Sequence, residues 1–166
     1  MRQLLLIIFI ILFFCSSSLS QENLKSSTEF IVAGKGWGVV SINSDRKEIE
    51  KVLGKGKNSS VYDDVYFIDY PKKGIQISYE NETNKAYAIF FYNKERWYED
   101  FETPDIKTDK GISWASSPKE VIEAYGKPKN HYKDNGDGSI WQRIVFEGID
   151  FRFENNKMVR IGIPGR

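Results

Sequence analysis

The sole histidine, His131, is the first residue to consider as a source of chemistry. A catalytic zinc ion takes three protein ligands, and the sequence offers His131 no second histidine and no neighbouring cysteine. As a general base, its ring would need a nucleophile or a carboxylate brought beside it by folding. His131 lies in a polar stretch just after a predicted helix, so we expect a solvated loop histidine.

Two glycine-rich stretches resemble ligand-binding loops only in part. In Lys133–Gly138, the register of a calcium loop places Lys133 at the first ligand position and Ile144 at the last, where a glutamate is required. Gly34–Gly38 has the spacing of neither a P-loop nor a dinucleotide-binding turn. We therefore expect a loop before a strand at the first stretch and a lead-in to a strand at the second, with no metal and no cofactor.

Asp63 and Asp64 are the carboxylates on which an enzymatic interpretation depends. A pair of carboxylates suffices for glycoside hydrolysis, and aromatic residues make up 14% of the chain. No spacing in the sequence sets one carboxylate opposite another across a cleft. A glycan-acting hydrolase is therefore the less favoured alternative, and we expect a protein that is not an enzyme.

Alternation along the C-terminal strands gathers a different set of side chains. If Ile149, Phe151 and Phe153 point to a helix, the residues between them point to the opposite, wet face of a sheet. The residues expected there, and predicted to contact a partner, are Trp141, Arg143, Asp150, Arg152 and Arg160. Tryptophan and arginine are typical anchors of protein interfaces. The alternative is that the charged members form ordinary cross-strand ion pairs and that Trp141 belongs to the core.

The elements that position these residues occur twice along the chain. With a shift of 72 residues, Lys47–Lys55 aligns with Lys119–Lys127, and with two further residues Gly74–Asn81 aligns with Gly148–Asn155. The first pair of segments predicts short helices, with Ser117 and Glu120 forming a capping box in the second copy. The second pair alternates apolar and polar residues, which is typical of strands with one wet face.

The predicted fold class is therefore α+β, with two tandem repeats, each a short helix packed on an antiparallel sheet of about three to four strands. We assign residues 21–98 to the first repeat and 99–166 to the second, joined through Asn93–Lys110, with some strand around Trp97–Phe101. In the first helix, the expected apolar stripe is Ile49, Val52 and Leu53. The residues expected on the wet face of the first repeat are Gln76, Ser78, Ala88 and Phe90.

Several motifs of the second repeat resemble those of a known family of repeats. Gly111-Ile112, the polar cap at Ser116-Ser117, Glu120-Val121 and the Tyr125–Pro128 run resemble repeats of exported bacterial proteins of the β-lactamase-inhibitor-protein type. They also resemble the small outer-membrane-assembly lipoproteins with an SmpA/OmlA domain. The resemblance implies helix-on-sheet units, side by side in the inhibitor case, where the joined sheet binds an enzyme on its concave face.

The N-terminus predicts export. Arg2 is followed by an apolar run from Leu4 to Phe14, too short to span a bilayer, and by small residues that suit a signal peptidase. We therefore predict a signal peptide over residues 1–20 and a periplasmic or secreted protein. Two fates of Cys15 remain open, because a lipid-attachment site prefers a small residue where Phe14 stands. Cys15 is either a lipid anchor or one more apolar residue of the signal.

Bulk composition narrows the class of partner. The chain has 24 basic and 23 acidic residues, and removal of the signal with Arg2 makes these numbers equal. Nucleic-acid binding requires a basic surplus, so we expect no nucleic-acid partner. No further apolar run predicts a membrane span in the mature chain. The leading hypothesis is an exported, non-catalytic binding protein that engages a protein partner through the solvent-facing side of its sheet, and the alternative is a structural or assembly factor of the cell envelope.

Overall fold

The computed structural model describes residues 30–94, 98–136 and 138–165. The expected signal peptide over residues 1–20, Cys15 and Trp97 lie outside these ranges. The helices are α2 (Arg46–Leu53), α3 (Pro118–Tyr125) and a short 3-10 turn, η1 (Pro71–Lys73). The strands are β1 (Phe30–Val32), β2 (Gly36–Trp37), β3 (Val40–Ser41), β4 (Lys57–Tyr62), β5 (Val65–Tyr70), β6 (Ile75–Glu80), β7 (Ala86–Tyr92), β8 (Lys107–Thr108), β9 (Asn130–Gly136), β10 (Ser139–Phe146), β11 (Ile149–Glu154) and β12 (Lys157–Ile163).

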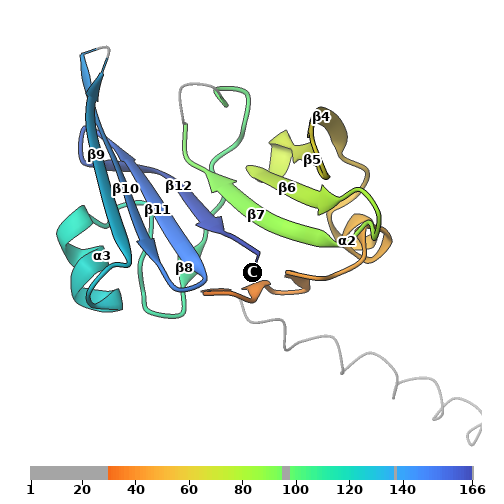
Figure 1. The fold of residues 1–166 in the computed structure, drawn as a ribbon, viewed down its shortest axis with the longest axis horizontal. Helices are drawn as coiled ribbons and strands as arrows, with labels where there is room; N and C mark the ends of the chain where they lie inside the picture. The colour runs from red at the N-terminus through yellow and green to blue at the C-terminus, as the bar shows by residue number, and fades with distance from the viewer. Residues whose placement is uncertain (1–29, 95–97, 137, 166) are drawn as a thin grey trace, which may run out of the picture.

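Eight strands form one sheet in the order β4-β5-β6-β7-β12-β11-β10-β9 (Figure 1). Each helix precedes four of them along the chain, α2 before β4–β7 and α3 before β9–β12. The two sets meet where β7 pairs antiparallel with β12, with Ile161 opposite Phe91. The α+β class is confirmed. The expectation of two tandem repeats, each with a sheet of its own, is corrected, because the last strand of each set hydrogen-bonds with the other and closes a single sheet.

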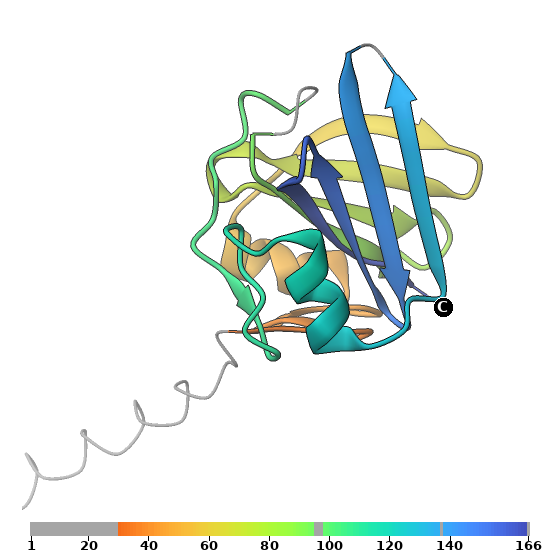
Figure 2. The ribbon, with the colours of Figure 1, turned by 90° about the vertical axis from the view of Figure 1, so that its left-hand side faces the viewer.

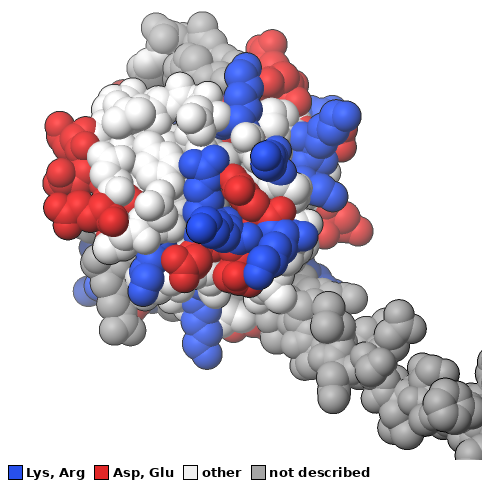
Figure 3. All heavy atoms as spheres, turned by 90° about the vertical axis from the view of Figure 1, so that its right-hand side faces the viewer, with Lys and Arg blue, Asp and Glu red and all other residues white. Residues whose placement is uncertain are grey.

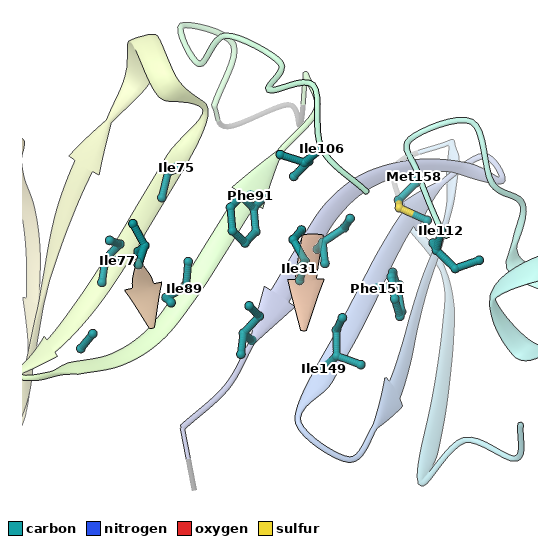
Figure 4. Packing of buried hydrophobic residues seen from close by; sticks show 14 of the residues in the cluster. Ile31, Ile75, Ile77, Ile89, Phe91, Ile106, Ile112, Ile149, Phe151 and Met158 are labelled. Carbon is teal, nitrogen blue, oxygen red and sulfur yellow. The ribbon is translucent and has the colours of Figure 1, made fainter. Parts of the chain in front are cut away.

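A second, four-stranded sheet of mixed direction has the order β3-β2-β1-β8. β1 pairs antiparallel with β2 and parallel with β8, so the connection before α3 is tied to the N-terminal segment. Ile31 of β1 is fully buried and lies over the seam between β7 and β12 (Figure 4). Three of its strands come from the first half and β8 comes from the second, so the small sheet also ties the halves together and the two halves are not equal repeats.

Helix α3 begins at a capping box, as the sequence predicts. The Ser117 hydroxyl accepts a hydrogen bond from the Glu120 backbone N–H, and the Glu120 carboxylate accepts one from the Ser117 N–H. These hydrogen bonds lower the pKa of the Glu120 carboxyl below its usual value. The helix lies in front of the strands in Figure 2, with the Tyr125 ring 5.1 Å from that of Phe146. The cap fixes the residue at which the short helix begins, and the aromatic contact fixes where the helix packs on the sheet.

Replacing Ser117 by alanine is expected to lower the free energy of unfolding by about 1 kcal/mol, because the Glu120 N–H loses its acceptor. Urea denaturation followed by circular dichroism measures the loss. Lys119→Ala, at an exposed position of the same helix, is the matched control and is expected to change stability by no more than about 0.5 kcal/mol. Equal losses in the two variants would contradict a stabilising cap.

Helix α2 meets the sheet along a narrower stripe than expected. Ile49 is fully buried and Leu53 is half-buried, but Val52 is 54% exposed. The stripe predicted to include Val52 is therefore wrong at that position. An eight-residue helix makes only about two turns, and here the residues four apart face the sheet while the residue between them faces solvent.

Three stretches differ from the predicted strands and loops. The apolar pattern predicts a strand over Val61–Tyr70, but a turn at Asp63-Asp64 divides this stretch between β4 and β5. Asn130–Gly136, expected to be loop, forms β9, which runs antiparallel along β10 at the edge of the sheet. His131 is thus an exposed residue of an edge strand, with its Nε2 3.3 Å from Oε1 of Gln142. Tyr98–Phe101, where strand was expected, forms a turn.

Three of the four residues predicted on the wet face of the first half are covered, and the fourth, Phe90, is half-buried. Gln76, Ser78 and Ala88 are all buried, contrary to the expectation from their polar or small side chains. The connection between the halves lies against this face, because the Tyr98 ring stacks on Tyr92 at 3.9 Å and its hydroxyl lies 3.4 Å from Oε1 of Gln76. The second half therefore carries the more open part of the face.

Elsewhere the surface carries charges of both signs. Figure 3 shows lysine, arginine, aspartate and glutamate side chains intermingled over one side of the molecule, next to an area without charged groups. In the part of the chain that the structure describes, no helix combines the length and the apolar character needed to cross a bilayer.

Candidate binding site

Three arginines stand side by side on the outer face of the sheet, which is the face of β9–β12 opposite α3. Arg143 of β10 lies directly opposite Arg152 of β11, and Arg152 lies opposite Arg160 of β12. Side chains in such positions have Cβ atoms about 4.5–5.5 Å apart, and like charges there are destabilising. We call Arg143, Arg152 and Arg160 the arginine row. Repulsion within the row opposes folding. We therefore expect oppositely charged groups that offset the repulsion, or a function that the row serves.

Asp150 supplies part of that compensation from below. Its side chain is only 1% exposed. Arg143 donates hydrogen bonds from Nη2 to Oδ2 at 3.0 Å and from Nε to Oδ1 at 3.3 Å, and Arg160 donates from Nη2 to Oδ1 at 3.4 Å. A buried carboxylate is tolerated only when it is paired and hydrogen-bonded in this way. Asp150 thereby holds two guanidinium groups of the row in place.

Gly162 makes room for that carboxylate. Gly162 of β12 lies opposite Asp150 of β11, and a Cβ atom there would come within 2.9 Å of Oδ2 of Asp150. Real side chains essentially never approach so closely, so a larger residue would displace the carboxylate from beneath the arginines. Gly162 is required here for space, as a structural partner of the ion pairs.

Aromatic rings flank the row on both sides. The guanidinium carbon of Arg152 lies 4.6 Å from the ring centroid of Trp141, and that of Arg160 lies 5.2 Å from the ring of Phe90. Contacts of this kind contribute about 0.5–2 kcal/mol each, with the larger values at sites shielded from water. The rings also limit how far the guanidinium planes can swing, so the row has a defined orientation.

The row opens into a groove of about 540 Å³ over β9–β12. We call it the arginine groove. Its lining residues are Tyr132, Asp134, Gly136, Trp141, Gln142, Arg143, Arg152 and Arg160. Tyr132 is 56% exposed and the Arg143 side chain is 46% exposed, so both are within reach of another molecule. The groove combines cationic and aromatic side chains, which can bind an anionic group next to an apolar one.

The structure brings the five sequence-predicted residues together on one face. Four of them, Trp141 and the arginine row, line the groove. Asp150 lies beneath the row, is buried and forms cross-strand ion pairs with Arg143 and Arg160, as the alternative interpretation expects of the charged residues. Trp141 is half-buried on the groove and is not a core residue. A role of these residues in binding remains a prediction.

Sequence reasoning missed the β9 side of the groove. Tyr132 and Asp134 lie opposite Arg143 and Trp141 across the β9–β10 pair. Their spacing by two residues, matching that of Trp141 and Arg143, was the available signal. The charged and glycine-rich context of Asn130–Gly136 masked it, because edge strands carry such residues without burying them.

Comparison with known proteins finds one solved structure with a similar fold. No family model and no curated sequence matches the chain. The fold is similar to the crystal structure of a DUF4309 family protein, YjgB, from Bacillus subtilis subsp. subtilis strain 168. The two chains are 9% identical, with 80% of this chain and 88% of that chain covered and a TM-score of 0.49.

The carboxylates considered for hydrolysis lie at the opposite end of the sheet. Asp63 and Asp64 form the exposed turn between β4 and β5 and, with Glu80 and Glu82, line a groove of about 660 Å³. The Asp63 and Asp64 side chains are both exposed on the hairpin turn, at the far end of the sheet from the arginine groove. Among the described residues, no group of three or more histidine, cysteine, aspartate or glutamate side chains is arranged to hold a metal ion.

Two tyrosines in the core carry perturbed hydroxyl groups. Burial raises the pKa of Tyr70 and, more strongly, that of Tyr79. Both rings belong to the hydrophobic core, and Tyr79 stacks on Tyr66 at 5.5 Å. Their hydroxyls are buried and stay protonated at neutral pH, and neither residue lines the arginine groove.

Proposed function

We propose that this chain is a non-catalytic binding protein that engages a protein partner through the arginine groove. The observation that carries the proposal is the arginine row, a set of like charges in adjacent cross-strand positions beside an exposed groove. An arrangement that opposes folding is retained more readily when it serves another purpose, and binding is the purpose that this composition fits.

Two further points support a protein as the ligand. Arginine, tryptophan and tyrosine are the residue types that carry most of the binding energy in protein interfaces, and all three line the groove. The resemblance to proteins of the β-lactamase-inhibitor-protein type also implies a partner on the open face of a joined sheet. The proposal includes export of the protein, which the N-terminal sequence predicts.

Site-specific photocrosslinking tests the proposal. A photoreactive amino acid in place of Tyr132 is expected to crosslink a discrete protein in envelope or culture-fluid extracts of the producing cells. The matched control has the same photoreactive amino acid in place of Val52, which is 54% exposed on α2 and far from the groove in sequence. Crosslinking at position 132 but not at position 52 is the expected result, because only the first position lines the groove.

Competition completes this test. Excess unlabelled wild-type protein is expected to suppress the crosslink, whereas a folded variant with Trp141→Ala and Arg152→Ala is expected not to, since it lacks the stacked pair of the groove. Absence of any crosslinked protein, equal labelling from positions 132 and 52, or equal competition by the double variant would each contradict the proposed function.

A further inference from the structure

We propose that the partner presents an acidic segment containing an aromatic or aliphatic residue, whose carboxylates contact the arginine row and whose apolar side chain packs on Tyr132. This inference rests on the proposed function and names the chemistry of the partner. It is carried by the charge, the remaining hydrogen-bond donors and the aromatic lining of the arginine groove.

Charge favours an acidic occupant. The row contributes three arginines, and the aspartates described around them are the buried Asp150 and Asp134 at the wall. Among the residues that the structure describes around the groove, arginines therefore outnumber aspartates by three to two. Complementary charge speeds association and selects the partner.

Arg143 retains donors for a second carboxylate. Its hydrogen bonds to Asp150 use Nε and Nη2, whereas a guanidinium group has five N–H donors. The side chain is 46% exposed, so the remaining donors are accessible from the groove. Because Asp150 already fixes the guanidinium plane, an incoming carboxylate loses little to ordering Arg143, and pre-organisation of this kind favours tight binding.

The aromatic lining accounts for the apolar part of the segment. Trp141 is half-buried beneath the Arg152 guanidinium, and Tyr132 is 56% exposed on the neighbouring strand. Rings of this kind give large contact areas at low entropic cost when an apolar side chain covers them. A segment with carboxylates alone would leave the exposed Tyr132 ring in water, so we infer a mixed acidic and apolar segment.

Two other occupants fit less well. Nucleic acid requires several lysine or arginine contacts to phosphates, and three arginines offset by two aspartates are too few for that. A second copy of this chain could supply carboxylates from the turn at Asp63 and Asp64, which lines the acidic groove with Glu80 and Glu82. Self-association is therefore the competing occupant that the experiment must separate.

The test uses defined peptides and the folded protein. The probe is a short fluorescein-labelled peptide with glutamates flanking one phenylalanine, and its control has glutamine in place of every glutamate. Fluorescence anisotropy is expected to show that wild-type protein binds the glutamate peptide at least about tenfold more tightly, because charge-assisted hydrogen bonds are lost with glutamine. Raising the salt concentration is expected to weaken binding of the glutamate peptide only.

A charge-matched pair of variants assigns the site. Arg143→Gln combined with Arg152→Gln is expected to weaken binding of the glutamate peptide at least about tenfold. Lys51→Gln combined with Lys119→Gln removes the same charge from exposed positions, 68% and 85% exposed on the helices, and is expected to leave binding within about twofold. Circular dichroism checks that both double variants are folded. The comparison of the two peptides uses only the wild-type protein, so it remains a test even if a variant does not fold.

Each contrary outcome has its own meaning. Equal binding of the two peptides, no binding of either, or equal loss in both double variants would overturn the acidic-segment inference. Sedimentation showing self-association that the arginine variant abolishes would overturn it in favour of a second copy. If the crosslink from position 132 succeeds but the captured protein binds the arginine variant unchanged, the inference fails while the proposed function stands.

Discussion

Replacing Asp150 by asparagine is expected to lower the free energy of unfolding by about 3–5 kcal/mol, because a buried ion pair loses one partner. The amide has nearly the size of the carboxylate and fits beside Gly162, so packing hardly changes. What changes is charge, because Arg143 and Arg160 lose their shared anion while remaining next to Arg152. Urea denaturation of the purified variant measures the loss.

Glu123→Gln provides the control for this substitution. Glu123 is 62% exposed and its Oε1 lies 3.6 Å from Nζ of Lys119, so removing its charge is expected to cost less than about 1 kcal/mol. Salt gives an independent check, since repulsion within the partly exposed row is screened and part of the loss in Asp150→Asn is expected to be recovered at high salt. A loss no larger than that of Glu123→Gln would show that Asp150 does not hold the row.

The face on which part of the candidate site lies could be predicted from the sequence because strand alternation is a local property. Phe151 and Phe153 are fully buried, and the residues between and before them, Arg152 and Asp150, point the other way. Side-chain direction follows from the backbone of one strand, so parity placed Arg152. The parity of the strand that carries Arg143 was ambiguous in the sequence and followed only from its pairing with β11. The burial of Asp150 did not follow, because it depends on Gly162 of a different strand.

The α+β fold class could be predicted from the sequence, but the joining of the two halves into one sheet could not. The capping box at Ser117 and the glycine after each helix are local, and the structure bears the capping box out. Whether β7 pairs with β12 depends on contacts between residues some seventy positions apart, which no local pattern encodes. The same applies to the covered face of the first half, where Tyr98 of the connection contacts Gln76. A polar edge strand such as β9 lacks the alternation that reveals buried strands.

Closure of both halves into one sheet predicts that they unfold together. Phe91 is fully buried, pairs with Ile161 across the seam and meets the Trp37 ring edge-on at 6.1 Å. Phe91→Ala is expected to lower the free energy of unfolding by about 3–5 kcal/mol, since it removes a large buried ring and leaves a cavity. The loss is expected to reach both halves, because the seam is the only hydrogen-bonded junction between them in the described part of the large sheet.

Native-state hydrogen exchange distinguishes this outcome from independent repeats. In the wild type, amides of β5 and β10, which lie on either side of the seam, are expected to share the highest opening free energy, and Phe91→Ala is expected to lower both by the same amount. Tyr62→Ala removes an aromatic ring that is 66% exposed and is expected to cost no more than about 0.5 kcal/mol. If the amides of β10 kept their protection while those of β5 lost it, the halves would be separate folding units despite the pairing of β7 with β12. The arginine groove would then be carried by the second half alone, and its rigidity would no longer depend on the seam.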